Sequence, residues 1–151
     1  MPLWQIYHPT GTFKDTVSKQ ALAEDITKMY TGIGLPSFYV VAQFIQMSES
    51  DVWVGGQPKI ANPFIRVVIT QIAVRLPDDD VAYKKNTTMI DNVLKPHIAD
   101  KGYDWEYHVD ETERRLWKIN GMIPPLWKSE EERLWCTENK PVPYEGAYAR
   151  F

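Results

Sequence analysis

The start of the chain carries the clearest chemical possibility. Pro2 follows Met1 directly and opens a short apolar stretch, Leu3 to Tyr7, that is typical of a β-strand. If Met1 is removed, Pro2 presents a secondary α-amino group that is held at the beginning of this strand. α-Amino groups titrate at about pH 7.7–8.0, and burial lowers that pKa because desolvation disfavours the charged form. Pro2 is therefore a candidate general base or acid at neutral pH, and an ordinary strand proline is the alternative.

The composition narrows the class of protein. The chain has 151 residues, of which 44% are hydrophobic and 25% charged, as expected of one soluble domain with a substantial core. A net charge of -3 provides no basic excess to neutralise phosphates, which argues against nucleic acid as a partner. The single cysteine, Cys136, excludes an intrachain disulfide and is typical of a reducing compartment, so we expect a cytoplasmic protein.

The sequence also argues against membrane, metal and cofactor sites. We find neither a signal-peptide pattern nor an apolar run approaching the roughly 20 residues of a membrane span. Gly55-Gly56 lacks the lysine and the helix start of a phosphate-binding loop. The three histidines do not have the spacing of a metal site; they are His8, His97 and His108. We therefore expect no metal, no cofactor and no membrane partner.

Hydrophobic patterning predicts two successive β-α-β units, at about 2–56 and 63–110. Each unit is expected to begin and end with a strand and to contain one helix whose apolar residues share a face. The first helix starts near Asp15, which can cap it, and ends before Gly32. The predicted strands are 3–7, 37–46, 64–73 and 103–109, and the second helix runs from about 76–80 to about 95.

Two such units side by side predict an α/β fold with a four-stranded sheet and both helices on one face. The other face would be apolar and uncovered, because strands 38–46 and 64–73 have too many apolar residues for a solvated surface. We therefore expect several copies of the chain to pack together. Residues 111–151 form an irregular extension, rich in tryptophan and proline, with a short helix at 129–135 that Ser129 and Glu132 can cap.

Four short stretches resemble the tautomerase superfamily, and within it the group of cis-3-chloroacrylic acid dehalogenase, especially fungal members with fused repeats. The resemblance covers most of residues 2–125. It implies a cofactor-independent homotrimer whose active sites centre on an N-terminal proline. The stretches are Met1-Pro2, Ala23-Glu24-Asp25-Ile26-Thr27, Val52-Trp53-Val54-Gly55-Gly56 and Trp105-Glu106-Tyr107.

The resemblance assigns roles residue by residue. Pro2 matches the catalytic proline, and Tyr107 matches a tyrosine on the fourth strand that positions water or substrate. Tyr30 stands where the dehalogenase has a histidine at the end of the first helix. Arg75 fills one of two arginine positions that hold a substrate carboxylate, and no second arginine stands beside it. Lys118 aligns nearest to the water-activating glutamate of the group.

Each of these assignments has a structural alternative. Tyr30 lies on the apolar helix face, where core packing explains it, and Arg75 could pair with the acidic run 78–80. Arg66, early on the third strand, is a further carboxylate candidate with an intersubunit ion pair as its rival. Lys118 and Asn120 lie in an irregular segment, where polar groups either line sites or face solvent.

The sequence thus predicts a tautomerase-type enzyme that acts on a small 2-keto or enol carboxylic acid. One alternative is a hydratase or cis-3-haloacrylate dehalogenase that acts on a short unsaturated acid. That chemistry would need another residue in place of the missing water-activating carboxylate. The other alternative is a non-catalytic trimeric interaction protein that has kept the fold.

Overall fold

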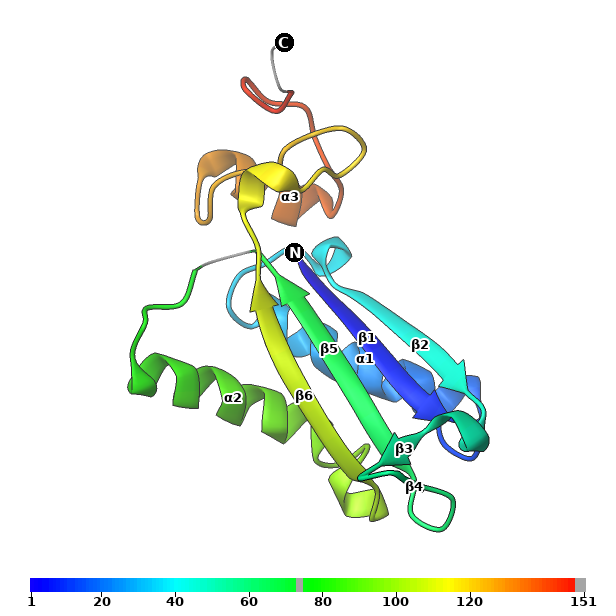
Figure 1. Cartoon of the computed structure of the whole chain (residues 1–151). Helices are drawn as coiled ribbons and strands as arrows, with labels where there is room; N and C mark the ends of the chain where they lie inside the picture. The colour runs from blue at the N-terminus through cyan, green and yellow to red at the C-terminus, as the bar shows by residue number, and fades with distance from the viewer. Residues whose placement is uncertain (73–74, 149–151) are drawn as a thin grey trace.

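A four-stranded sheet forms the centre of the molecule in the computed structural model, which describes residues 1–72 and 75–148 (Figure 1). The strands are β1 (Pro2–Pro9), β2 (Val41–Met47), β5 (Phe64–Gln71) and β6 (Asp104–Glu111), in the order β2-β1-β5-β6. Strands β1 and β2 are parallel, as are β5 and β6, while β1 and β5 are antiparallel. The two β-α-β units therefore meet along β1 and β5, and the predicted α/β fold is confirmed.

Two helices cover one face of this sheet, α1 (Thr16–Thr31) and α2 (Asp80–Leu94) (Figure 1). Asp15 and Asp79 cap them by accepting backbone N–H groups of Ser18 and Ala82 at 2.6 and 2.8 Å. Apolar side chains of the strands and helices pack together between the two layers. The fully buried members include Trp4, Ile6, Leu22, Ile26, Ile65, Val67, Ile69 and Leu94.

No helix of the described residues covers the opposite face of the sheet (Figure 1). Along β1 and β5 buried side chains alternate with partly exposed ones, as a sheet covered on one side requires. The uncovered positions include apolar residues: Val41 is 38% exposed, and Leu3 and Val68 are partly exposed. This face is the expected surface for contact between copies of the chain.

The C-terminal extension folds over the end of the sheet where β1 begins (Figure 1). Its helix α3 (Glu130–Glu138) is capped by Ser129 and buries Trp135 completely. The Trp135 ring lies against Phe38, Tyr39 and Tyr144, with ring centroids 5.9–6.1 Å apart. The extension is therefore a packed part of the fold, and its apolar composition is explained by this docking.

The structure corrects one sequence-based boundary. Residues Ser37–Tyr39, predicted as strand, form a 3-10 turn, and β2 begins only at Val41. The reason is tertiary, because this turn packs against α3 instead of extending the sheet. The predicted turn at Gly55-Gly56 is the tip of a small hairpin made of β3 (Trp53–Val54) and β4 (Gln57–Pro58). Ala73, the predicted end of the third strand, lies outside the described residues.

None of the helices in the described ranges is both long and apolar enough to span a bilayer.

Candidate active site

Pro2 lies at the junction between the sheet and the C-terminal extension. It is buried as the first residue of β1, and its register partner on β5 is Gln71, the last residue of that strand. The start of the chain lies directly beneath α3 (Figure 1). Segments from distant parts of the chain, β5 and α3, therefore lie beside the position where the resemblance places the reacting group.

A chain of buried hydrogen bonds lies beside Pro2 on the helix side of the sheet. The indole N–H of Trp4 donates to the Tyr30 hydroxyl at 3.1 Å, and that hydroxyl donates to Gln71 Oε1 at 3.3 Å. Burial raises the pKa of Tyr30 to about 12, so its hydroxyl is neutral at pH 7. Tyr30 thus lies at the Pro2 end of the sheet, but both hydrogen-bonding directions of its hydroxyl are used internally.

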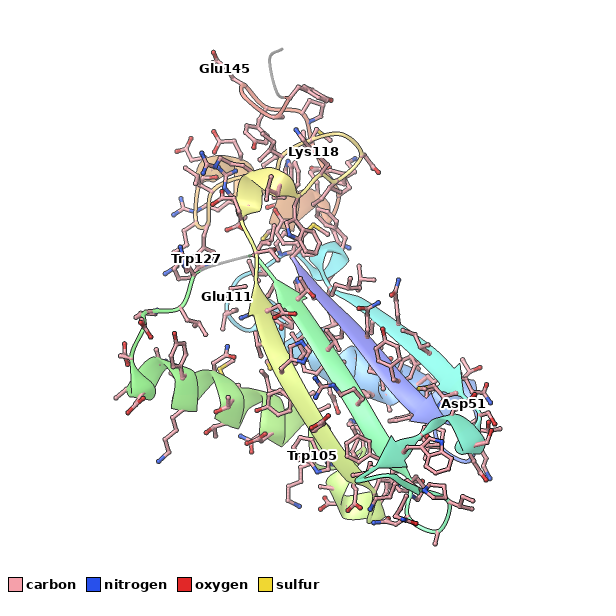
Figure 2. All side chains as sticks on the ribbon, in the orientation of Figure 1. Asp51, Trp105, Glu111, Lys118, Trp127 and Glu145 are labelled. Carbon is pink, nitrogen blue, oxygen red and sulfur yellow. The ribbon has the colours of Figure 1, made fainter. Side chains whose placement is uncertain are left out.

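A cavity of about 590 Å³ opens between the ends of β5 and β6 and the extension. Arg75 and Arg114 contribute cationic groups, Gln71 an amide, and Leu126 and Trp127 an apolar wall. Figure 2 shows Glu111, the last residue of β6, and Trp127 at this junction. Glu111 and Glu113 line the cavity too, so it combines an apolar wall with groups of both charges, as small-molecule sites often do.

The Arg114 guanidinium is held in place inside the extension. It donates a hydrogen bond to the Pro124 carbonyl. Burial raises the pKa of the Tyr144 hydroxyl, and the positive charge of Arg114 opposes that rise, which places the two groups close together. Arg75 forms no ion pair with the acidic run 78–80 or with any other carboxylate in the described residues. The alternative role predicted for Arg75, an ion pair with the acidic run, is therefore not found.

Two further polar groups are buried in this region. Glu132 on α3 is only 4% exposed, and its Oε2 accepts the Lys128 backbone N–H at 2.6 Å. The Tyr39 hydroxyl, on a side chain 2% exposed, has no hydrogen-bond partner among the described residues. Burial raises the pKa of both groups. With Met1 in place, burial lowers the pKa of the N-terminal amine to about 5, and the charge of Glu132 acts in the opposite direction.

Two predicted site residues lie away from Pro2 within one chain. Tyr107 pairs in register with Val67, four residues before Gln71, or ~13 Å along the strand. Its hydroxyl donates to Asp91 Oδ1 at 3.0 Å and to the Thr87 carbonyl at 3.3 Å, both on α2. Its role in a site stays a prediction.

Arg66 lies on the uncovered sheet face, and its guanidinium binds Glu106 Oε1 at 2.8 Å and the His108 ring. Within one chain it therefore has an internal ion-pair partner, and its role as a carboxylate ligand also stays a prediction.

Lys118 and Asn120 both belong to the outer part of the extension. Lys118 is exposed and lies above the sheet end (Figure 2). Asn120 has a φ of 49° and forms a tight turn with Gly121, closed by two hydrogen bonds between Ile119 and Met122. Neither residue lines the cavity beside Gln71. Among the described residues, no three His, Cys, Asp or Glu side chains are grouped as a metal site requires.

Sequence reasoning missed four residues of this region: Gln71, Arg114, Tyr39 and Glu132. Gln71 could have been found from the strand register, since it ends the strand that pairs with β1. Glu132 carried a signal as a capping residue, and the structure confirms that it reaches back to the turn before its helix. No sequence pattern indicated Arg114 or Tyr39, because the positions of both depend on how the extension docks.

Comparison with known proteins identifies the family. Residues 1–140 match the family model described as putative oxalocrotonate tautomerase enzyme. RhCC from Rhodococcus jostii RHA1 has 38% sequence identity and a TM-score of 0.86; the match covers 94% of this chain and 99% of that one. A probable enzyme from the thermophilic fungus Aspergillus fumigatus has 40% identity and a TM-score of 0.86, over 95% of this chain and 98% of that one.

Two more distant structures share the fold. One is N1, a member of the cis-3-chloroacrylic acid dehalogenase family, with 14% identity, a TM-score of 0.68, and coverage of 91% of this chain and 97% of that one. The other is a fused 4-OT described as a symmetric trimer, with 18% identity, a TM-score of 0.60, and coverage of 78% and 90%. No curated protein matches the sequence. The match over nearly the whole chain, together with the two β-α-β units, shows that this chain belongs to the tautomerase superfamily.

Proposed function

We propose that this protein is a tautomerase-type enzyme in which Pro2, with Met1 removed, acts as general base and general acid on a small 2-keto or enol carboxylic acid. The observation that carries the proposal is the cavity with Arg75 and Arg114 beside the buried start of β1. A proton-transfer group and a carboxylate-binding group are thereby adjacent at one end of the sheet.

The reaction needs one group that can accept and return a proton. A neutral Pro2 amine takes the hydroxyl proton of the enol, so that the O–H bond breaks and the carbonyl forms. The resulting ammonium group gives a proton to the neighbouring carbon, forming the C–H bond and restoring the amine. Burial supports the neutral starting state, because it lowers the pKa of the α-amino group at this end of the chain to about 5 with Met1 present.

The cavity supplies the groups that would orient the acid. A guanidinium can bind a carboxylate through two parallel hydrogen bonds, and Arg75 and Arg114 both line the cavity. Gln71 both lines the cavity and pairs in register with Pro2. Leu126 and Trp127 offer an apolar surface for the hydrocarbon part of the substrate. The cavity therefore favours a carboxylic acid with an apolar substituent.

We further propose that the enzyme is a homotrimer, located in the cytoplasm. The uncovered sheet face contains Leu3, Val41 and Val68, whose burial a second copy would complete. The fused 4-OT relative with this fold is described as a symmetric trimer. Light scattering of the purified protein tests this proposal, and a stable monomer at micromolar concentration would contradict it.

The experiment on activity begins with intact mass, which shows whether Pro2 is N-terminal. Ketonisation of phenylpyruvate-type enols is then compared for the wild type, Pro2→Ala and Arg114→Ala. We expect Pro2→Ala to lower kcat about 10²–10⁴-fold, the usual contribution of general acid–base catalysis. Arg114→Ala should mainly raise KM, while Arg133→Ala, at an exposed arginine on α3 that does not line the cavity, serves as the matched control. Equal activity of the wild type and Pro2→Ala would rule out the proline mechanism and favour a non-catalytic protein.

Hydration of a short unsaturated acid is the second candidate. Glu111 and Glu113 line the same cavity, so carboxylates are present where water could be activated. The Glu113 carboxylate, however, binds the Arg115 side chain at 2.7 Å, and Glu111 Oε1 accepts the Leu76 backbone N–H at 2.9 Å. Because both are engaged, tautomerisation remains the preferred reaction.

A further inference from the structure

Glu132 is a buried carboxylate that the proposed proton transfer does not use. It is 4% exposed, although ionisable side chains are rarely this buried without a partner. The hydrogen bond from the Lys128 N–H to Oε2 accounts for one of its two carboxylate oxygens. That bond fixes the turn before α3, but it does not require a carboxylate, because a neutral amide oxygen would accept it equally well.

The position of Glu132 is set by contacts on three sides of α3. Trp135 fills the space between Tyr39 and Tyr144. Asn139, with a φ of 47° at the helix end, accepts hydrogen bonds from Ser37 Oγ and the Phe38 N–H at 2.8 and 3.1 Å. Cys136 Sγ donates to the Gly34 carbonyl at 3.3 Å. The helix therefore presents Glu132 to the start of β1 in a defined orientation.

A second unexplained group lies at the same place. The Tyr39 hydroxyl is buried and has no hydrogen-bond partner in the described ranges, although its ring packs on Trp135. Burial raises its pKa, and the negative charge of Glu132 adds to that rise, so the two groups are near each other. A buried carboxylate with one oxygen unaccounted for thus lies near an unpartnered buried hydroxyl, and buried polar groups normally have partners.

We propose that Glu132 is the counter-ion of the Pro2 amine: its buried carboxylate stabilises the protonated amine that exists between the two proton transfers. The inference rests on the proposed function, in which Pro2 must be protonated during part of each cycle. Glu132 does not touch the substrate in this scheme and is a positioning residue. It adds no proton to the balance, because the proton that Pro2 takes from the enol oxygen is returned to carbon.

The charges around the start of the chain agree with this role. With Met1 present, burial lowers the pKa of the N-terminal amine, and Glu132 is the charged side chain that raises it. In return, burial raises the pKa of Glu132, and the positive N-terminus lowers it. The other elements packed at this end contribute two neutral phenols, Tyr30 and Tyr39. The neighbouring cavity contributes two cations and two carboxylates, none of which acts on the pKa of the amine: Arg75, Arg114, Glu111 and Glu113. Glu132 is thus the carboxylate that opposes the burial of the amine.

The test is a direct titration of the Pro2 amine, with no turnover required. Protein whose mass shows Pro2 as the first residue is labelled with ¹⁵N-proline, and the ¹⁵N shift of Pro2 is followed against pH. We expect Glu132→Gln, which keeps the acceptor for the Lys128 N–H, to lower the pKa of the amine by about one unit, at the lower end of the effect of a nearby opposite charge. Glu132→Asp, which keeps the charge, should restore most of the shift.

Glu131→Gln is the matched control, because Glu131 is the exposed neighbour on the same helix. It should leave the pKa of the amine unchanged. An unchanged pKa in Glu132→Gln would overturn the inference. If that variant does not fold, the inference is tested on the wild-type protein alone. There, the Glu132 side-chain carboxyl ¹³C signal must show a step at the pH where the Pro2 amine titrates, and its absence overturns the inference equally.

The titration separates this inference from the proposed function. If the protein is inactive but the pKa of its amine changes in Glu132→Gln, the counter-ion inference is supported and the tautomerase proposal is rejected. If the enzyme is active but that pKa does not change, the counter-ion inference is rejected and the tautomerase proposal stands. In an active enzyme, the pH at which kcat/KM falls should move with the amine in Glu132→Gln, a change that a purely structural role of Glu132 would not cause.

Discussion

The two ends of β1 are built in different ways, although each buries a polar group without a partner. At the Pro2 end this group is the Tyr39 hydroxyl, and at the other end it is Nε2 of His8, whose side chain is 1% exposed. The His8 end is closed by nearby residues: His8 Nδ1 lies 3.2 Å from Thr12 Oγ1, and the ring packs on Phe13 and Phe44. At the Pro2 end, α3 arrives from more than a hundred residues away.

The difference shows that the burial of an unpartnered polar group does not by itself identify a functional site. His8 also has an unpartnered nitrogen; burial lowers its pKa, and the positive charge of Lys19 is close enough to lower it further. The Pro2 end combines an unpartnered hydroxyl with a buried carboxylate, two arginines and a cavity of about 590 Å³. Such a combination requires segments from distant parts of the sequence, and the C-terminal extension is the segment that supplies most of it.

Truncating Trp135, the buried side chain that docks α3 at the Pro2 end, should have the largest effect of the changes considered. Trp135→Ala is expected to lower the free energy of unfolding by about 3–5 kcal/mol, the usual cost of truncating a fully buried aromatic residue. Urea unfolding at a fixed protein concentration measures it. Trp53→Ala, at a tryptophan that is 60% exposed, is the control and should cost less than about 1 kcal/mol. Similar losses in the two variants would contradict the docking of α3 as described.

The two buried tyrosines at the Pro2 end should respond in opposite ways. Tyr30→Phe removes a hydroxyl that joins Trp4 to Gln71, and we expect it to lower the free energy of unfolding by about 1–3 kcal/mol. Tyr39→Phe removes a hydroxyl without a partner, so stability should stay within about 0.5 kcal/mol of the wild type or rise. The same unfolding series measures both, and a clear loss in Tyr39→Phe would mean that its hydroxyl has an unseen partner.

The smallest effect is expected at the His8 end and depends on pH. Burial lowers the pKa of His8 below its usual 6.5, so the folded state favours the neutral ring. The unfolded chain then binds more protons, and stability is lost as the pH falls from about 6.5 through the lower pKa of the folded state. Between pH 6.5 and 5, the slope of unfolding free energy against pH should be shallower in His8→Asn than in the wild type. Equal slopes would show that His8 does not titrate on unfolding in this range.

Much of the fold was predictable from the sequence because its signals are local. The alternation along β1 and β5, the capping aspartates and the apolar helix faces are patterns within single elements. The prediction went wrong at Ser37–Tyr39, where aromatic and β-branched residues predict a strand but the docked extension imposes a turn. Strand propensity at that point loses to packing against Trp135.

The candidate site was predictable only in part, for the same reason. Pro2 and Arg75 could be proposed from the sequence, because Pro2 opens and Arg75 follows a recognisable strand. Arg114 was not found, because it lies in an irregular segment and reaches the cavity through the way that segment folds back. Tyr107 and Arg66 matched local patterns, yet register places them partway along the sheet and not at its end.

The hydrogen bonds that Asn139 accepts affect the order of events in folding. One of them joins residues separated by 102 positions, Ser37 and Asn139. Contacts of such long range form late, since the entropy of closing the loop must be overcome before the contact stabilises anything. During synthesis the sheet can therefore assemble while the entrance to Pro2 is still open to solvent and to processing enzymes. The newly made chain should pass through a stage in which Met1 is accessible, and that stage ends when α3 docks.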